Sequence, residues 1–131
     1  MGISPEVVDS KRIPRLGPYS QAVKVGNLIF TAGQPGVDPL TRRPPGTTFE
    51  SQARQAFSNL KTVLEDAGSS MERVVRVTCY VSDAANFLKM NELFQEFFPD
   101  SPPARSTPIV ALPNHLLFSI DAIAVMNEGG E

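Results

Sequence analysis

The chain has 131 residues, 41% of them hydrophobic, with a formal net charge of -2 and a pI near 5.4. This length allows one hydrophobic core, so we expect a single domain over residues 1–131. The 12 Lys and Arg residues are scattered rather than gathered in a basic run, which makes nucleic acid an unlikely partner.

Signals of membrane insertion, secretion and metal binding are missing from the sequence. No stretch approaches the roughly 18 apolar residues that a membrane span needs, and residues 1–24 hold no apolar signal region. We therefore expect a cytoplasmic protein with no membrane contact. One cysteine, Cys79, and one histidine, His115, cannot make a disulfide or a Cys/His metal site, so we expect no metal and no cofactor.

The first predicted elements form a β-hairpin. The pair Gly26-Asn27 separates two β-prone runs at 23–25 and 28–31, which is typical of a two-residue hairpin turn. A short extra strand near Val37 is left open.

A helix is predicted to follow from residue 48. Thr47 and Glu50 are spaced as a capping box, and Gly68 supplies the stop. Between them, apolar residues recur at intervals of three and four, as on one face of a helix: Phe49, Ala53, Ala56, Phe57, Leu60, Val63, Leu64 and Ala67.

A strand and a second helix are predicted next. Residues 73–81 alternate, with Val75, Val77, Cys79 and Val81 assigned to one face. Ser82 or Asp83 then caps a helix that Pro99 cannot continue. Its apolar stripe contains Phe87, Met90, Leu93 or Phe94, and Phe97.

Two last strands are predicted at 104–110 and 116–126, joined by a turn at 112–115. The order is ββ-α-β-α-ββ, an α+β fold whose mixed sheet carries two helices on one face. The other face holds apolar side chains such as Leu117, Ile123 and Val125, and this short chain has nothing left to cover them. We therefore expect burial against other subunits.

Arg105 is the most prominent candidate binding residue, because it enters a strand directly after two prolines. A guanidinium donates two parallel hydrogen bonds to a carboxylate. Strand alternation places Thr107 on the same face. The competing interpretation is a salt bridge at the rim of the protein.

Other candidates are less specific. Ser119 and Asp121 share a strand face with apolar neighbours, so they are either structural residues or site residues, and Asp121 could pair with an Arg or Lys on a neighbouring strand. Gly33 could bring a backbone N–H close to a ligand. Tyr19 is interpreted as a half-buried packing residue rather than a catalytic phenol, and Cys79 as a small core residue.

Ordered blocks from about residue 17 to 125 together resemble the RidA (YjgF-like) family. The blocks are Gly-Pro-Tyr-Ser-Gln-Ala at 17–22, Thr-Ala-Gly-Gln at 31–34, Asn91 with Phe97-Phe98, Pro-Ala-Arg-Ser at 103–106, Leu112-Pro113 and Ile-Asp-Ala-Ile-Ala at 120–124. The resemblance implies a chorismate-mutase-like fold assembled as a homotrimer, with the sheets forming a central barrel and three clefts between subunits.

The same resemblance implies roles for individual residues. Arg105 would bind the substrate carboxylate, Gly33 would offer its backbone, and Tyr19 would line the cleft. Asn91 matches a position near the subunit interface. Thr107 stands where deaminating members often have cysteine, and its backbone could still hold ligand or water.

Ser119 departs from the family pattern, because imine-hydrolysing members have a glutamate there that positions and activates water. Serine is a poor base, and losing a general base typically costs about two to four powers of ten in rate.

Two functions therefore compete. One is hydrolytic deamination of small reactive 2-imino or enamine acids to 2-oxo acids and ammonia, including a 2-aminomuconate-type deaminase. The alternative is a non-catalytic protein that binds 2-oxo acids or similar carboxylates. A ribonuclease is disfavoured, since the sequence shows no basic stripe and no acid/base pair.

Overall fold

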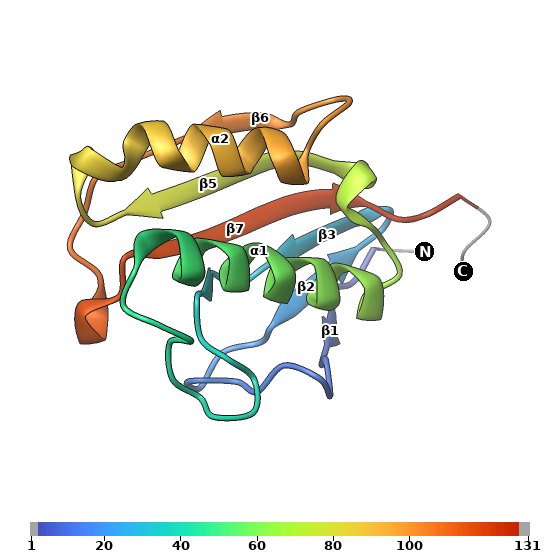
Figure 1. Ribbon diagram of the computed structural model, residues 1–131. Helices are drawn as coiled ribbons and strands as arrows, with labels where there is room; N and C mark the ends of the chain where they lie inside the picture. Colours follow the sequence, from blue (N-terminus) through green and yellow to red (C-terminus); the bar gives the residue numbers. More distant parts are fainter. Residues whose placement is uncertain (1–2, 129–131) are drawn as a thin grey trace.

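A computed structural model describes residues 3–128 and shows one mixed sheet with two helices on one face (Figure 1). Along the chain the elements are β1 (Glu6–Val8), β2 (Ala22–Val25), β3 (Leu28–Thr31), β4 (Gln34–Pro35), α1 (Phe49–Asp66), β5 (Val74–Val81), α2 (Phe87–Phe97), β6 (Ala104–Ser106) and β7 (Phe118–Val125). Short 3-10 turns lie at Met71–Arg73, Ala84–Asn86 and Pro113–His115.

The strand order is β1-β2-β3-β7-β5-β6, with β4 also paired to β7. Only β5 and β6 run parallel in the described sheet, and the other pairs are antiparallel. The predicted α+β class and the central order ββ-α-β-α-ββ are confirmed. Two short strands are added to that order: β1, which the sequence did not reveal, and β4, just before the position left open at Val37.

The hairpin prediction is confirmed, because Gly26 adopts a left-handed φ of 58° and Val25 pairs with Leu28.

The first helix is also confirmed, but its cap is shifted by one residue. Thr48, not Thr47, is the N-cap, and its hydroxyl accepts a hydrogen bond from the Ser51 backbone N–H at 3.1 Å. Gly68 follows the helix with a left-handed φ of 91°.

The predicted alternation of β5 holds only from Val77 onward. Val74 is buried whereas Val75 is 48% exposed, the reverse of the predicted faces. The reason is a β-bulge opposite β7 between Val74 and Arg76, which inserts one residue and reverses the alternation.

The last predicted strand pair is likewise confirmed only in part: β6 ends at Ser106, and Ile109 forms a single bridge with Val81.

The core lies between the sheet and the two helices. Phe57 of α1 is fully buried at its centre, stacked on Phe97 of α2 with ring centroids 4.6 Å apart and 5.4 Å from the ring of Phe118 on β7. β7 alternates strictly, so residues 118, 120, 122 and 124 are buried under the helices while 119, 121, 123 and 125 are partly exposed on the opposite face. Figure 1 shows no helix on that opposite face within residues 3–128.

Within the described part of the chain, no helix combines the length and the apolar character that crossing a membrane requires.

Candidate functional site

A hollow of about 500 Å³ lies where β4 pairs with the start of β7. It brings together three residues that the sequence singled out, Tyr19, Gly33 and Ser119. The other lining residues were not predicted as site residues and are mostly apolar: Leu16, Ala32, Pro35, Leu112, Pro113, Asn114 and Leu116. The only signal for them was their place within or beside the family blocks.

Ser119 and Gly33 are in close proximity. Ser119 lies opposite Pro35 in the β4–β7 pair, and Gly33 directly precedes β4. A Cβ atom added at Gly33 would lie 3.1 Å from the Ser119 Oγ atom, which is closer than nearly all real Cβ contacts. Glycine at this position therefore lets the Ser119 hydroxyl lie against the backbone.

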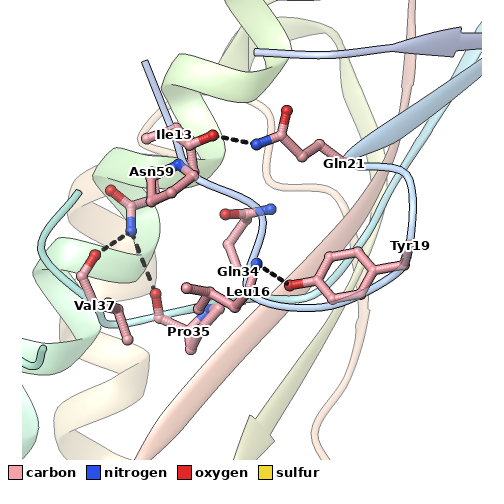
Figure 2. A pocket seen from close by; sticks show the side chains of 9 residues that line it. Ile13, Leu16, Tyr19, Gln21, Gln34, Pro35, Val37 and Asn59 are labelled. Atoms are coloured by element: carbon pink, nitrogen blue, oxygen red, sulfur yellow. Dashed lines mark hydrogen bonds between the residues drawn. The ribbon is translucent and has the colours of Figure 1, made fainter. Parts of the chain in front are cut away.

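Tyr19 borders both this hollow and a second cavity of about 10 Å³ (Figure 2). Its hydroxyl accepts a hydrogen bond from the Leu16 backbone N–H at 3.3 Å, which closes the loop 16–19. A Cβ at Gly17 would lie 2.9 Å from the Tyr19 ring, so the ring packs directly on the glycine. The loop thus holds the tyrosine at the rim of the hollow.

Two buried amides connect this rim to the rest of the fold, and sequence reasoning missed both. The Gln21 side chain donates to the Ile13 carbonyl, and Asn59 of α1 donates to the carbonyls of Val37 at 2.8 Å and Pro35 at 3.3 Å, as Figure 2 shows. Because unpaired carbonyls are costly inside a protein, these bonds stabilise the paths of the chain on either side of the first hairpin.

Arg105 is not part of this hollow. Its guanidinium carbon lies 4.8 Å from the ring centroid of Phe94 and 5.7 Å from that of Phe87, and Nη1 lies 3.8 Å from the Met90 sulfur. Among the ion pairs of residues 3–128, none includes Arg105, so the salt-bridge interpretation finds no support. Cation–π contacts hold the half-buried arginine against α2.

The two other predicted binding residues also lie outside the hollow. Asn91 belongs to α2 and is half-buried, directly after Met90, which the arginine contacts. Thr107 follows β6 and is half-buried as well. The predicted site residues therefore fall into two groups, one at the hollow and one beside α2 and β6.

These two groups lie on opposite sides of the sheet. Arg105 pairs with Val77, which is fully buried beneath the helices, whereas Ser119 pairs with Tyr80 on the uncovered face. Val77 and Tyr80 are three residues apart on one strand, so their side chains point in opposite directions. Within one chain, Ser119 and Arg105 therefore do not face the same space.

Asp121 accepts a hydrogen bond from the Tyr80 hydroxyl at 3.0 Å. The alternative that it pairs with an Arg or Lys of a neighbouring strand is not found among the ion pairs of residues 3–128. Burial, and then the hydrogen bond to Asp121, raise the pKa of Tyr80.

Burial also raises the pKa of the Cys79 thiol to about 12. The thiol therefore stays protonated at neutral pH, and its interpretation as a core residue is confirmed by its complete burial.

Within residues 3–128, no group of three or more His, Cys, Asp or Glu side chains is arranged to hold a metal ion. The described chain is thus a single-domain α+β protein with an uncharged hollow near one end of its sheet and an arginine without an ion pair on the other side.

Comparison with known proteins identifies the family. The family model described as Endoribonuclease L-PSP matches residues 10–126. A RutC family protein of Pyrococcus abyssi is 43% identical over 121 residues, covering 91% of this chain and 95% of the relative. A 2-iminobutanoate/2-iminopropanoate deaminase of Dermatophagoides farinae is 39% identical over 112 residues, covering 85% and 88%.

Solved structures agree with this assignment. The crystal structure of E. coli TdcF with bound serine has a TM-score of 0.87 and 34% identity, covering 93% of this chain and 99% of that chain. The chain belongs to the RidA/YjgF/RutC family, whose members include reactive-intermediate deaminases.

Proposed function

We propose that the protein hydrolyses small reactive 2-imino and enamine acids to 2-oxo acids and ammonia. The observation that carries the proposal is the guanidinium of Arg105, which is half-buried over two aromatic rings and forms no ion pair among the described residues. A guanidinium held in this way can donate two parallel hydrogen bonds to a carboxylate. Family membership adds the imine chemistry.

The complete site belongs to a homotrimer, with Arg105 of one subunit facing Tyr19, Gly33 and Ser119 of another. Two features support this assembly. The described chain leaves one face of its sheet uncovered, with Phe30 40% exposed and Ile123 half-buried there. Arg105 also lies on the opposite side of the sheet from Ser119, so only a second chain can complete the cleft.

In this cleft the arginine binds the substrate carboxylate and thereby orients the C=N bond. A protonated imine is electrophilic, so water adds to its carbon and gives a tetrahedral amino alcohol. A proton moves from oxygen to nitrogen, the C–N bond breaks, and ammonia leaves. The remaining hydroxyl group gives up its proton to the departing ammonia or to solvent, which yields the 2-oxo acid. The Ser119 hydroxyl and the backbones of Gly33 and Thr107 orient the water, while the serine contributes no strong base.

Two measurements on one variant test this proposal. Arg105→Ala should weaken the binding of 2-oxobutanoate by roughly ten- to a hundred-fold, the worth of about 1.5–3 kcal/mol for hydrogen bonds to a charged group. It should also lower ammonia release from freshly generated 2-iminobutanoate. Arg105→Lys should restore only part of the affinity, since one ammonium lacks the planar fork.

Arg42→Ala is the matched control, because Arg42 is an exposed arginine of the loop between β4 and α1 and lies outside the hollow. Unchanged affinity in Arg105→Ala by calorimetric titration would remove the arginine from the site.

A second candidate function is binding without turnover, and the serine at position 119 favours it. The same arginine would then hold a 2-oxo acid, with no base to activate water. The two functions differ in one result: a binding protein shows the Arg105-dependent affinity for 2-oxobutanoate but releases no ammonia above the spontaneous rate.

A further inference from the structure

The hollow beside Ser119 is uncharged, and this property bears on the substrate. None of the ten residues that line it is acidic or basic. Six of them present aliphatic or proline side chains: Leu16, Ala32, Pro35, Leu112, Pro113 and Leu116. Its volume of about 500 Å³ falls within the range of small-molecule sites and exceeds what a two-carbon side chain fills.

The polar groups of the hollow are few and neutral. The Tyr19 hydroxyl already accepts a hydrogen bond from the Leu16 N–H. The Ser119 hydroxyl lies close to the position that a Cβ on Gly33 would occupy, at 3.1 Å, and so lies against the backbone. A carboxylate placed among these groups would lose its hydration without gaining a cationic partner from this chain, which is strongly unfavourable.

Serine at position 119 also determines how much of the hollow stays open. A glutamate there would carry one more methylene group and a carboxylate toward the same space. The serine side chain ends beside Gly33 and leaves the remaining volume to the apolar residues of the loop 112–116. Asn114 and His115 adopt left-handed φ angles of 57° in this loop, and Leu116 next to them is buried.

We infer that the protein selects 2-imino acids with branched aliphatic or aromatic side chains over shorter ones and over dicarboxylic acids. The inference rests on the proposed function and names its substrate class. The apolar side chain occupies the hollow of one subunit, and the α-carboxylate points to Arg105 of another. The 2-aminomuconate-type substrate, a dicarboxylate, does not fit this arrangement, because its second carboxylate has no cation in the lining.

The test compares the binding of four 2-oxo acids to the wild-type protein by calorimetric titration, so that it does not depend on turnover. We expect 4-methyl-2-oxopentanoate and phenylpyruvate to bind about tenfold or more tightly than 2-oxobutanoate, in line with the discrimination that apolar pockets achieve per methylene. 2-Oxoglutarate should bind most weakly. Imines generated in situ from the corresponding amino acids should give the same order in kcat/KM.

Two variants probe the lining directly. Leu112→Ala should reduce the preference for 4-methyl-2-oxopentanoate over 2-oxobutanoate by several-fold, since it removes part of the apolar wall. Leu112→Lys should raise the affinity for 2-oxoglutarate relative to 4-methyl-2-oxopentanoate by supplying the missing cation. Leu40→Ala, at a highly exposed leucine outside the hollow, is the matched control and should keep the wild-type order.

The possible failures are distinguishable. Equal affinities across the series, or tightest binding of 2-oxoglutarate, would overturn the substrate class while leaving the proposed deaminase function in place. If no 2-oxo acid binds and no imine is hydrolysed, both proposals are overturned.

Discussion

The two faces of the central sheet differ in what their side chains do, although they share the same strands. On β7, Phe118 and Ile120 are fully buried under the helices, while Ser119 and Asp121 between them face the other side. Successive side chains of a strand point to opposite faces of the sheet, so a register shift of one residue would exchange the buried and the exposed side chains. A single strand thus supplies both the core and the candidate site.

The covered face forms the hydrophobic core, and we propose that the uncovered face contacts other subunits. Beneath the helices, the aromatic rings of Phe57, Phe94, Phe97, Phe98 and Phe118 pack against one another. The uncovered face instead mixes large apolar side chains with polar groups such as the Tyr80–Asp121 hydrogen bond. Changes on the two faces should therefore produce different kinds of failure.

The largest expected effect is the loss of assembly when a charge enters the uncovered face. Phe30 is 40% exposed there and pairs with Ile123. Phe30→Asp should convert the proposed homotrimer into single chains, because an unpaired carboxylate is costly in an apolar interface. Native mass spectrometry measures this. Leu88→Asp, at a position of α2 that is 75% exposed, is the control and should remain trimeric. A trimeric Phe30→Asp would show that this face is not the assembly surface.

The next largest effect is expected on the covered face. Phe57→Ala removes the fully buried ring that stacks on Phe97, and should lower the free energy of unfolding by about 3–5 kcal/mol. Urea denaturation at fixed protein concentration measures the change. Leu88→Ala should stay within about 0.5 kcal/mol of wild type. A loss below about 1 kcal/mol for Phe57→Ala would mean that the aromatic cluster repacks around the vacancy.

A smaller effect, of the opposite sign, is expected from Ser119→Glu. The new carboxylate should raise kcat on 2-iminobutanoate by at least about tenfold, or roughly 1.4 kcal/mol, since activating water stabilises the transition state. Steady-state kinetics should show the gain in kcat rather than KM, and Arg105→Ala should abolish it. Ser58→Glu, on the exposed side of α1, provides the control. A folded, trimeric Ser119→Glu with unchanged kcat would exclude position 119 from water activation.

The smallest effect concerns the exposed end of α1. Hydrogen bonding from Arg12, whose Nη2 lies 2.6 Å from Oδ1, and then from Ser10, lowers the pKa of Asp66. Because the pKa of Asp66 is lower in the folded chain than in the unfolded chain, its charged carboxylate stabilises the fold at pH values above the ordinary pKa, near 4. This contribution is lost as the pH falls through the lowered pKa. Asp66→Asn should reduce the urea midpoint at pH 7 by less than about 0.5 M. The difference from wild type should shrink below pH 4, and a difference that persists there would assign it to hydrogen bonding by the neutral side chain instead.

The sequence was informative wherever a structural signal was local. The Gly26-Asn27 turn, the stripe of α1 and the alternation of β7 each involve residues a few positions apart, and each was read correctly. The β1 strand carries no comparable signal: its residues are mostly exposed, and they form a strand only because β2 offers them partners. Val75 likewise lies on the opposite face from the predicted one because of a bulge against β7, which is almost fifty positions further along the chain.

The candidate site divides in the same way. The sequence by itself determined which residues stand at the family positions, including Arg105, Tyr19, Gly33 and the serine that replaces a glutamate at 119. Only the tertiary structure decided that Arg105 lies under α2 while the other three line an uncharged hollow, and that Leu112 and Leu116 share its wall with Leu16. The physical reason is that long-range strand pairing sets which side of the sheet each residue occupies: β6 pairs with β5, and β7 pairs with β5 and with β3 of the first hairpin.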